Sequence, residues 1–180
     1  FITGADYPSG IAVDDTYIYW SNGGANSIGR ALLDGSGVNQ NFITGAFFPM
    51  QVTTDGTYLY WANQNSHRIG RANLDWSGVN QNFITNGNPT WAVAVDGSHI
   101  YWGSTVDDSI GRANLDGSAP NQNFITGVDW PGGLAVDESY IYWTSFTQAK
   151  IGRANIDGSG VNLNFIASGV SFGGGLWIDG

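Results

Sequence analysis

The sequence repeats itself with a period of 41 residues, and this repetition constrains the fold more than any other feature. The repeated phrase begins at Ile18-Tyr-Trp and resumes, after a short polar gap, at Ile28-Gly-Arg-Ala. A fixed period of this size indicates a repeat architecture in which each copy is one supersecondary unit. The period runs without slippage through five phenylalanines: Phe1, Phe42, Phe83, Phe124 and Phe165.

Each copy contains four runs of strand length, separated by Gly, Asp, Asn and Ser. In the first copy these runs predict strands over Gly10–Asp14, Tyr17–Ser21, Ser27–Leu33 and Gln40–Thr44. No stretch keeps an apolar period of 3.6 residues over three turns, so no helix is expected.

Side-chain alternation indicates sheets that are covered on both sides. Both faces of Tyr17-Ile-Tyr-Trp20 are apolar, which requires neighbours above and below the sheet. Gly29, Ala31 and Leu33 share one face of small residues, which we expect to let another sheet approach closely. A four-stranded unit stacked between copies of itself is a propeller blade, usually of about 40–45 residues. We therefore predict an all-β fold, a β-propeller of four-stranded antiparallel blades. A linear stack of β coils is the rival, but its coils are shorter and more uniform.

The repeats predict one propeller domain over 1–180, or a portion of one, with blades at about 5–45, 46–86, 87–127 and 128–168. Partial blade strands are expected at both ends, a fourth strand in 1–4 and a first strand in 169–180. A fifth blade built from these ends would lack its second and third strands. We therefore expect a ring of five or six blades, completed by a further part of the same polypeptide or by a second chain.

Charge and composition exclude several classes of function. The formal net charge of -9 disfavours a polyanionic partner, so no nucleic acid is expected. No apolar run approaches the roughly 20 residues of a membrane span. The chain has no Cys, and His67 and His99 occupy different columns of the repeat, so no zinc site is predicted. The stretch from Asp34 to Asn41 lacks the dense oxygen pattern and closing Glu of a calcium loop. No metal and no cofactor are expected.

The pair Tyr19-Trp20, preceded by Gly-Ile-Ala-Val-Asp and followed by Ile-Gly-Arg-Ala-x-Leu-Asp-Gly, resembles the YWTD repeat of the low-density-lipoprotein-receptor type. The resemblance covers nearly the whole chain and occurs four times, and the near-identical copies look like a recently amplified bacterial array. It implies a six-bladed propeller that binds other proteins in an extracellular or cell-surface setting. The family's Asp is absent from all four tetrapeptides, so its role falls to Asn22, Asn63 and weaker substitutes.

Residues that recur in every copy are interpreted as the scaffold that makes the blades alike and holds them together. Arg can form a forked contact with a carboxylate or with turn carbonyls, and Asp before Gly favours a turn through side-chain to backbone bonds. The scaffold positions are Tyr19, Trp20, Arg30, Asp34, Tyr60, Trp61, Arg71, Asp75, Tyr101, Trp102, Arg112, Asp116, Tyr142, Trp143, Arg153 and Asp157.

The copies differ in two connections, from the fourth strand to the next first strand and from the second strand to the third. Both connections emerge on one face of a propeller, and variable loops on a rigid scaffold are where binding usually occurs. Packing of the aromatic residues into blade–blade seams is the alternative. The predicted ligand-binding residues are Tyr7, Phe47, Phe48, Trp91, Trp130, Phe146, Asp107, Asp108, Asp129, His67 and Arg68. We expect Asp6, Lys150 and Phe172 close to them.

These features favour a non-enzymatic binding or scaffold module that recognises a protein or peptide, because aromatic anchors with polar neighbours suit such interfaces. A carbohydrate-binding, lectin-like propeller is an alternative, since aromatic faces beside Asp suit sugar rings. A propeller lyase or hydrolase is a lower alternative. It requires a titratable cluster, for which Asp107, Asp108, His67 and Lys150 are the candidates. A purely structural array, with open ends completed by neighbours, is a fourth possibility.

Overall fold

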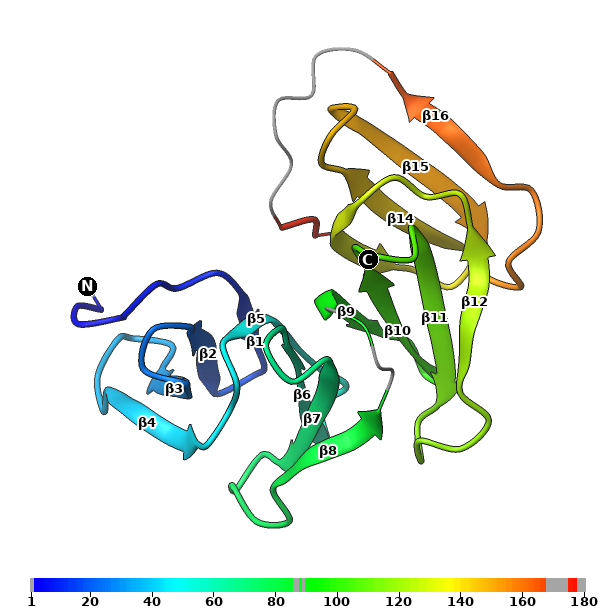
Figure 1. Ribbon diagram of the computed structural model, residues 1–180. Helices are drawn as coiled ribbons and strands as arrows, with labels where there is room; N and C mark the ends of the chain where they lie inside the picture. Colours follow the sequence, from blue (N-terminus) through cyan, green and yellow to red (C-terminus); the bar gives the residue numbers. More distant parts are fainter. Residues whose placement is uncertain (1, 86–87, 89, 168–174, 178–180) are drawn as a thin grey trace. The chain divides into compact units, whose positions relative to one another are not determined.

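The computed structural model describes residues 2–85, 88, 90–167 and 175–177, and these residues form strands and turns without a helix (Figure 1). The 16 strands form four antiparallel sheets of four strands, each with its strands in chain order. The predicted all-β class and the four-stranded antiparallel blades are therefore confirmed. The chain divides into two compact units, Phe1–Gly87 and Asn88–Gly180.

The first unit contains blades 1 and 2. Blade 1 consists of β1 (Ile11–Val13), β2 (Tyr17–Asn22), β3 (Ser27–Leu32) and β4 (Asn39–Thr44). Blade 2 consists of β5 (Pro49–Thr54), β6 (Tyr58–Asn63), β7 (Arg68–Asn73) and β8 (Asn80–Thr85).

The second unit contains blades 3 and 4. Blade 3 consists of β9 (Thr90–Val95), β10 (His99–Ser104), β11 (Ser109–Asn114) and β12 (Asn121–Thr126). Blade 4 consists of β13 (Pro131–Val136), β14 (Tyr140–Ser145), β15 (Lys150–Asn155) and β16 (Asn162–Ile166).

The glycine of the repeated Ile-Gly-Arg-Ala makes room for the tryptophan on the neighbouring strand. Trp20 of β2 lies opposite Gly29 of β3, and a Cβ on Gly29 would lie 2.2 Å from the indole. The expectation that Gly29 admits a neighbouring sheet is therefore wrong, because an indole of its own sheet fills that space. Leu33, expected on the same face, lies beyond the end of β3.

Each unit has a hydrophobic core between its two blades. In the first unit Tyr19 and Ile43 of blade 1 belong to one buried cluster with Val52 of blade 2. In the second unit Ile125 of blade 3 clusters with Leu134 of blade 4. Blade-on-blade packing within each unit thus buries apolar residues on one face of each blade, and we call these two interfaces seams.

A glutamine in the fourth strand connects the buried tryptophan to the preceding blade. In blade 2 the indole Nε1 of Trp61 donates to Gln81 Oε1 (3.0 Å), and Gln81 Nε2 donates to the carbonyl of Thr44 in blade 1 (3.0 Å). In blade 4 the equivalent residue is Leu163, which can make neither bond. The same indole-to-glutamine bond joins Trp20 to Gln40 (2.8 Å) and Trp102 to Gln122 (2.9 Å).

The two ends of the chain differ from the expected edge strands. Ile2–Gly4 forms no strand, since no neighbouring strand pairs with it. The carbonyl of Thr3 still accepts a hydrogen bond from Gln40 Nε2 (2.7 Å). Gly175–Trp177 carries no strand either, and the rest of the strand expected in 169–180, together with Phe1 and Phe172, lies outside the described residues.

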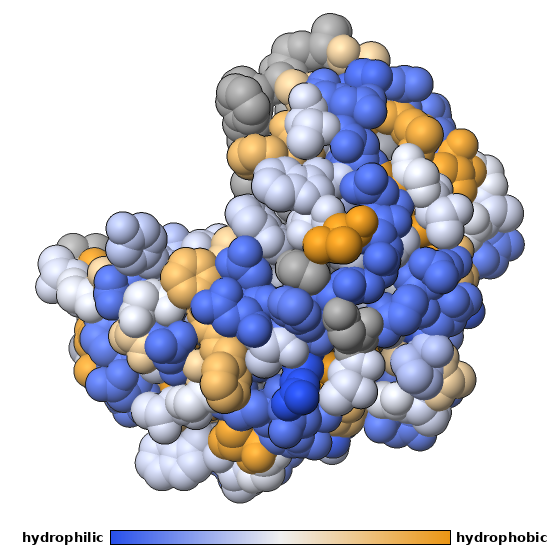
Figure 2. All heavy atoms as spheres, in the orientation of Figure 1, coloured by the Kyte–Doolittle hydropathy of each residue, from blue (hydrophilic) through white to orange (hydrophobic). Residues whose placement is uncertain are grey.

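The face visible in Figure 2 is largely hydrophilic, with separate hydrophobic patches. The described residues contain no helix that is long and apolar enough to cross a bilayer. Over the same residues, no group of three or more His, Cys, Asp or Glu side chains is arranged to hold a metal ion.

Candidate ligand-binding loop face

Two loops lie side by side at one edge of a blade. The entry loop precedes the first strand (residues 5–10, 45–48 and 127–130), and the hairpin loop joins the second and third strands (residues 23–26, 64–67, 105–108 and 146–149). In blade 4 the backbone N–H of Phe146 donates to the carbonyl of Trp130 (3.1 Å), and in blade 2 Gln64 donates to Phe48 (3.2 Å). We call the edge formed by these loops the loop face.

A hairpin-loop side chain also connects one blade to the entry loop of the next blade within each unit. Asn26 Oδ1 of blade 1 accepts a hydrogen bond from the backbone N–H of Phe48 (2.8 Å). In the second unit Asp108 Oδ1 accepts from the N–H of Trp130 (3.2 Å), and the Asp108 carbonyl accepts from Val128 (3.0 Å). The entry loops are therefore held by hydrogen bonds from the hairpin loop of their own blade and from the hairpin loop of the preceding blade.

The aromatic residues of the entry loops have a strained backbone. Tyr7, Phe48 and Trp130 occupy one column of the repeat and have φ of 49°, 53° and 45°. A bulky residue with positive φ is uncommon, costs of order 1–3 kcal/mol, and persists where the surroundings fix it. The hydrogen bonds to Phe48 and Trp130 supply that restraint.

Three aromatic rings cluster on the loop face of the second unit. The ring centroid of Trp130 lies 5.6 Å from that of Trp91 and 5.3 Å from that of Phe146, and Trp91 and Phe146 are 6.4 Å apart. All three side chains are half-buried. The cluster is thus supported from below and still offers ring surface to solvent, and we call it the aromatic triad.

Two carboxylates of the loop face in this unit have hydrogen-bond partners, and one of them, Asp129, directly precedes Trp130. Asp129 Oδ2 accepts from Ser145 Oγ (3.1 Å) and from the hydroxyl of Thr147. Asp107 accepts from Asn88 Nδ2.

Among the residues that the structure describes, the titratable residues singled out in the second unit, Asp107, Asp108 and Lys150, are not joined to one another by ion pairs. The ammonium group of Lys150 donates instead to Gln148 Oε1 (3.0 Å).

The predicted binding residues fall on the loop faces of both units. Phe48 packs against Gly23, whereas Tyr7 and Phe47 are 75% and 50% exposed. Arg68 Nη1 donates to Asn82 Oδ1. The first unit holds Tyr7, Phe47, Phe48, His67 and Arg68, and the second holds Trp91, Asp107, Asp108, Asp129, Trp130 and Phe146.

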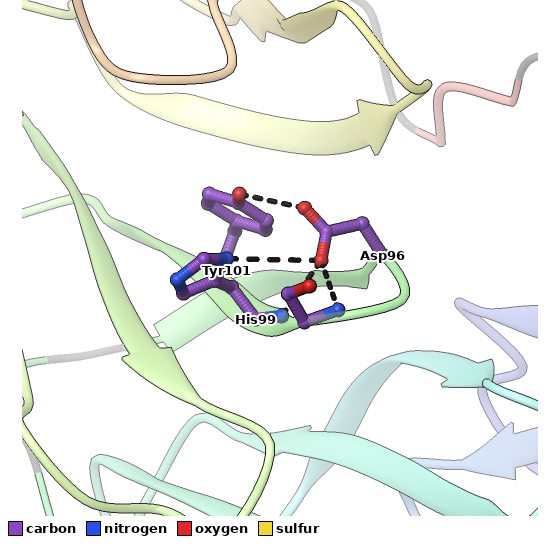
Figure 3. A network of polar contacts seen from close by, with 4 residues as sticks. Asp96, His99 and Tyr101 are labelled. Atoms are coloured by element: carbon purple, nitrogen blue, oxygen red, sulfur yellow. Dashed lines mark hydrogen bonds and ion pairs between the residues drawn. The ribbon is translucent and has the colours of Figure 1, made fainter.

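The Asp that directly follows the first strand of each repeat accepts hydrogen bonds from the turn to the second strand, and Figure 3 shows Asp96 as the example. Asp96 Oδ1 accepts from the N–H groups of Ser98 and His99 (2.6 Å each), and Oδ2 accepts from the hydroxyl of Tyr101 (2.8 Å). His99 Nδ1 lies 3.8 Å from Asp96 Oδ1. Burial, the bond to Asp96 and the charge of that carboxylate raise the pKa of Tyr101 above its ordinary value of 10. The Asp residues at this position of the repeat therefore stabilise the blades, and they lie at the opposite end of the strands from the hairpin loops.

In blade 1 the repeated arginine, Arg30, connects two blades. The Arg30 guanidinium lies over the rings of Tyr17 (4.1 Å) and Phe42 (3.9 Å). Its Nη1 donates to the carbonyl of Leu74 in blade 2 (3.1 Å). The aromatic part of this site was not foreseen from the sequence, although Phe42 recurs in every copy and Tyr17 recurs as Tyr58 and Tyr140, with His99 in the third copy.

Comparison with protein-family models and with curated protein sequences gives no match. Comparison with solved structures gives many matches. A chain of a nidogen/laminin complex is 21% identical with a TM-score of 0.85, covering 98% of this chain and 70% of that one. A gluconolactonase from Xanthomonas campestris is 16% identical with a TM-score of 0.78, covering 97% of this chain and 67% of that one. A streptogramin B lyase is 18% identical with a TM-score of 0.72, covering 94% of this chain and 58% of the lyase, so this chain spans less than two thirds of the lyase. Together with the four-stranded antiparallel blades, these similarities identify the fold as a β-propeller.

Proposed function

We propose that this chain is a non-enzymatic recognition module that binds a protein or peptide through the loop face of its second unit. The aromatic triad of Trp91, Trp130 and Phe146 is the observation that carries this proposal. Its three rings come from a strand, an entry loop and a hairpin loop, and they meet within 6.4 Å of one another. The resemblance to YWTD repeats supports the same class of function and an extracellular or cell-surface location.

The triad has the physical properties of a binding anchor. Half-buried tryptophans supply a large apolar area at low cost in side-chain entropy, and such residues dominate interface energies. Asp129, which directly precedes Trp130 in the entry loop, offers acceptor oxygens for polar or basic groups of a ligand. The hydrogen bonds to the entry loop fix Trp130 before binding, which reduces the ordering cost.

A glycan is the second candidate ligand. Its support is the combination of indole surface at Trp91 and Trp130 with the carboxylate of Asp129, which suits both the face and the hydroxyl groups of a sugar ring. The lyase and lactonase structures share the fold at 16–18% identity, and this level of likeness carries no reaction over to this chain.

Selection from a displayed peptide library, followed by calorimetry with the enriched peptides, tests the first candidate. We expect Trp130→Ala and Phe146→Ala to weaken binding by more than about tenfold, a loss of about 1.4 kcal/mol. Trp76→Ala is the matched control, because Trp76 is 57% exposed and lies in the turn between β7 and β8.

A glycan array probed with the same variants tests the second candidate. Array binding that Trp130→Ala abolishes, combined with a library that yields no peptide, would replace the peptide by a glycan. Enriched peptides that bind the triad variants as well as they bind the parent chain would overturn the proposal.

A further inference from the structure

The first blade exposes a face that is buried in the seams. We call the side of a blade that packs on the preceding blade its incoming face. Ile11 on the incoming face of blade 1 is 65% exposed. Its equivalents in the two seams, Val52 and Leu134, are 2% and 1% exposed.

Blade 4 exposes the opposite face, which we call the outgoing face. Ile166 of β16 is 42% exposed, whereas its equivalents Ile43 and Ile125 are each 2% exposed. Phe165 is 38% exposed, against 6% for Phe42. Hydrophobic side chains accordingly appear on the surface over β16 (Figure 2).

These two faces are the two halves of an interface that the chain itself builds twice. Ile43 and Val52 share one buried cluster, and Ile125 and Leu134 share the other. Ile166 repeats Ile43 and Ile125, and Ile11 repeats Val52 and Leu134, at multiples of 41 residues. The apolar surfaces are therefore complementary by the same packing that holds the seams.

The groups that make the polar contacts of a seam are also present on the two exposed faces. Arg153 repeats Arg30, and its guanidinium lies over the rings of Tyr140 (4.1 Å) and Phe165 (4.3 Å). Arg30 donates to the carbonyl of Leu74 (3.1 Å). The equivalent acceptor for Arg153 is the carbonyl of Leu33, on an exposed residue of blade 1.

The incoming face of blade 1 already holds a short segment with the sequence of an outer strand. The Thr3 carbonyl accepts from Gln40 (2.7 Å), as the Thr44 carbonyl accepts from Gln81 (3.0 Å). Ile2-Thr3 thus takes the place that the end of β4 takes on blade 2. This bond supports a role of the face in receiving the outer strand of a preceding repeat, and Phe165-Ile166-Ala167 is similar in sequence to Phe1-Ile2-Thr3.

We infer that the outgoing face of blade 4 binds the incoming face of blade 1 in a second copy of this chain. The contact is head to tail, with Ile166 of one copy seated against Ile11 of the other. β16 of the second copy replaces Ile2–Gly4 at the outer edge of blade 1. A heterologous contact of this kind closes into a ring or continues into a filament, according to the rotation between copies.

Light scattering coupled to size exclusion tests this inference with the chain of 19.2 kDa. We expect the parent chain to form species of at least twice that mass. Ile11→Asp and Ile166→Asp should each be monomeric alone, because every junction needs one intact head and one intact tail. A mixture of the two variants should regain one junction and give a two-chain species, because the Ile11→Asp chain keeps its tail and the Ile166→Asp chain keeps its head.

Three results would overturn the inference. They are a parent chain that stays at 19.2 kDa at its solubility limit, a single variant that still associates, and a mixture that stays monomeric. Because Ile11 and Ile166 are exposed, both variants should melt as the parent monomer does, which excludes misfolding as the cause. Val106→Asp is the matched control, since Val106 is 62% exposed on a hairpin loop, and it should leave the mass unchanged.

Deletion of residues 1–4 provides a separate measurement. It removes the segment that β16 must replace, so association should begin at a lower chain concentration than in the parent. Association that weakens on this deletion would contradict the exchange and overturn the inference.

Discussion

The indole N–H of Trp61 donates to Gln81 Oε1 at 3.0 Å, and the amide of the same glutamine reaches across the seam to the Thr44 carbonyl. One side chain thus satisfies a buried donor in its own blade and binds the blade before it. The equivalent residue in blade 4 is Leu163.

Exchange of residues at this column should change stability in opposite directions. Gln81→Leu should destabilise the chain by about 1–3 kcal/mol, because it leaves the buried indole N–H of Trp61 without its acceptor. Leu163→Gln should stabilise by about 0.5–1.5 kcal/mol, because it offers an acceptor to Trp143 and a donor to the Thr126 carbonyl. Urea unfolding of both variants measures the difference, and equal effects of the same sign would contradict the proposed role.

The glycine opposite each tryptophan should be far less replaceable than a glycine in open space. A Cβ on Gly111 would lie 2.2 Å from the Trp102 indole, whereas a Cβ on Gly97 of the same blade meets nothing within 4 Å. Gly111→Ala should destabilise by at least about 1–3 kcal/mol through overpacking. Gly97→Ala should be neutral or stabilise by up to about 1 kcal/mol through the unfolded chain. Comparable melting temperatures for the two variants would refute this assignment.

The repeated arginine should prove to be a structural residue. Arg30→Ala removes the contacts with Tyr17 and Phe42 and the bond to the Leu74 carbonyl, so we expect a loss of about 1–3 kcal/mol. Arg30→Lys keeps the charge but not the planar group, and it should recover only part of that loss. Peptides selected on the loop face of the parent should bind both variants unchanged at a temperature where both are folded. Full recovery by Lys would indicate that charge alone matters.

The repeat made the strands predictable, whereas the contacts between repeats were not. The period and the turn residues placed the second strand of blade 1 at Tyr17–Ser21, and β2 is Tyr17–Asn22. The sequence does not distinguish a glycine that admits a sheet from one that admits an indole, so the role of Gly29 was misassigned. That distinction depends on cross-strand register, which places Trp20 opposite Gly29.

The candidate site was less predictable than the fold. The variable loops could be located because they interrupt the repeat. The positive φ of Trp130 could not be foreseen, since no glycine marks the position and the restraint comes from Asp108, 22 residues away. The bonding of Gln40, Gln81 and Gln122 was also missed, although three identical glutamines at one column and Leu163 at the fourth were a visible signal.

Stability should be greatest between about pH 4 and pH 10, with an alkaline decline that depends on the buried tyrosines. Burial, the hydrogen bond to an Asp and the charge of that Asp raise the pKa of Tyr19, Tyr60 and Tyr101 above 10. A raised folded-state pKa means that the neutral hydroxyl is favoured in the folded chain. Its contribution is therefore complete below pH 10 and is lost as the pH rises further.

The loss of stability at low pH comes from carboxyl groups, whose pKa is lowered in the folded chain, in contrast to that of the tyrosines. The hydroxyl and backbone N–H of the Ser two residues later lower the pKa of Asp34, Asp75 and Asp157 below 3.8. A lowered folded-state pKa contributes stability above pH 3.8, and this contribution is lost as the pH falls below it. Melting temperatures recorded from pH 2 to pH 12 should thus show a plateau with two declining limbs. Tyr101→Phe should lower the plateau and flatten the alkaline limb while leaving the acid limb in place. An alkaline limb with the parent slope in Tyr101→Phe would show that the tyrosine does not contribute to it.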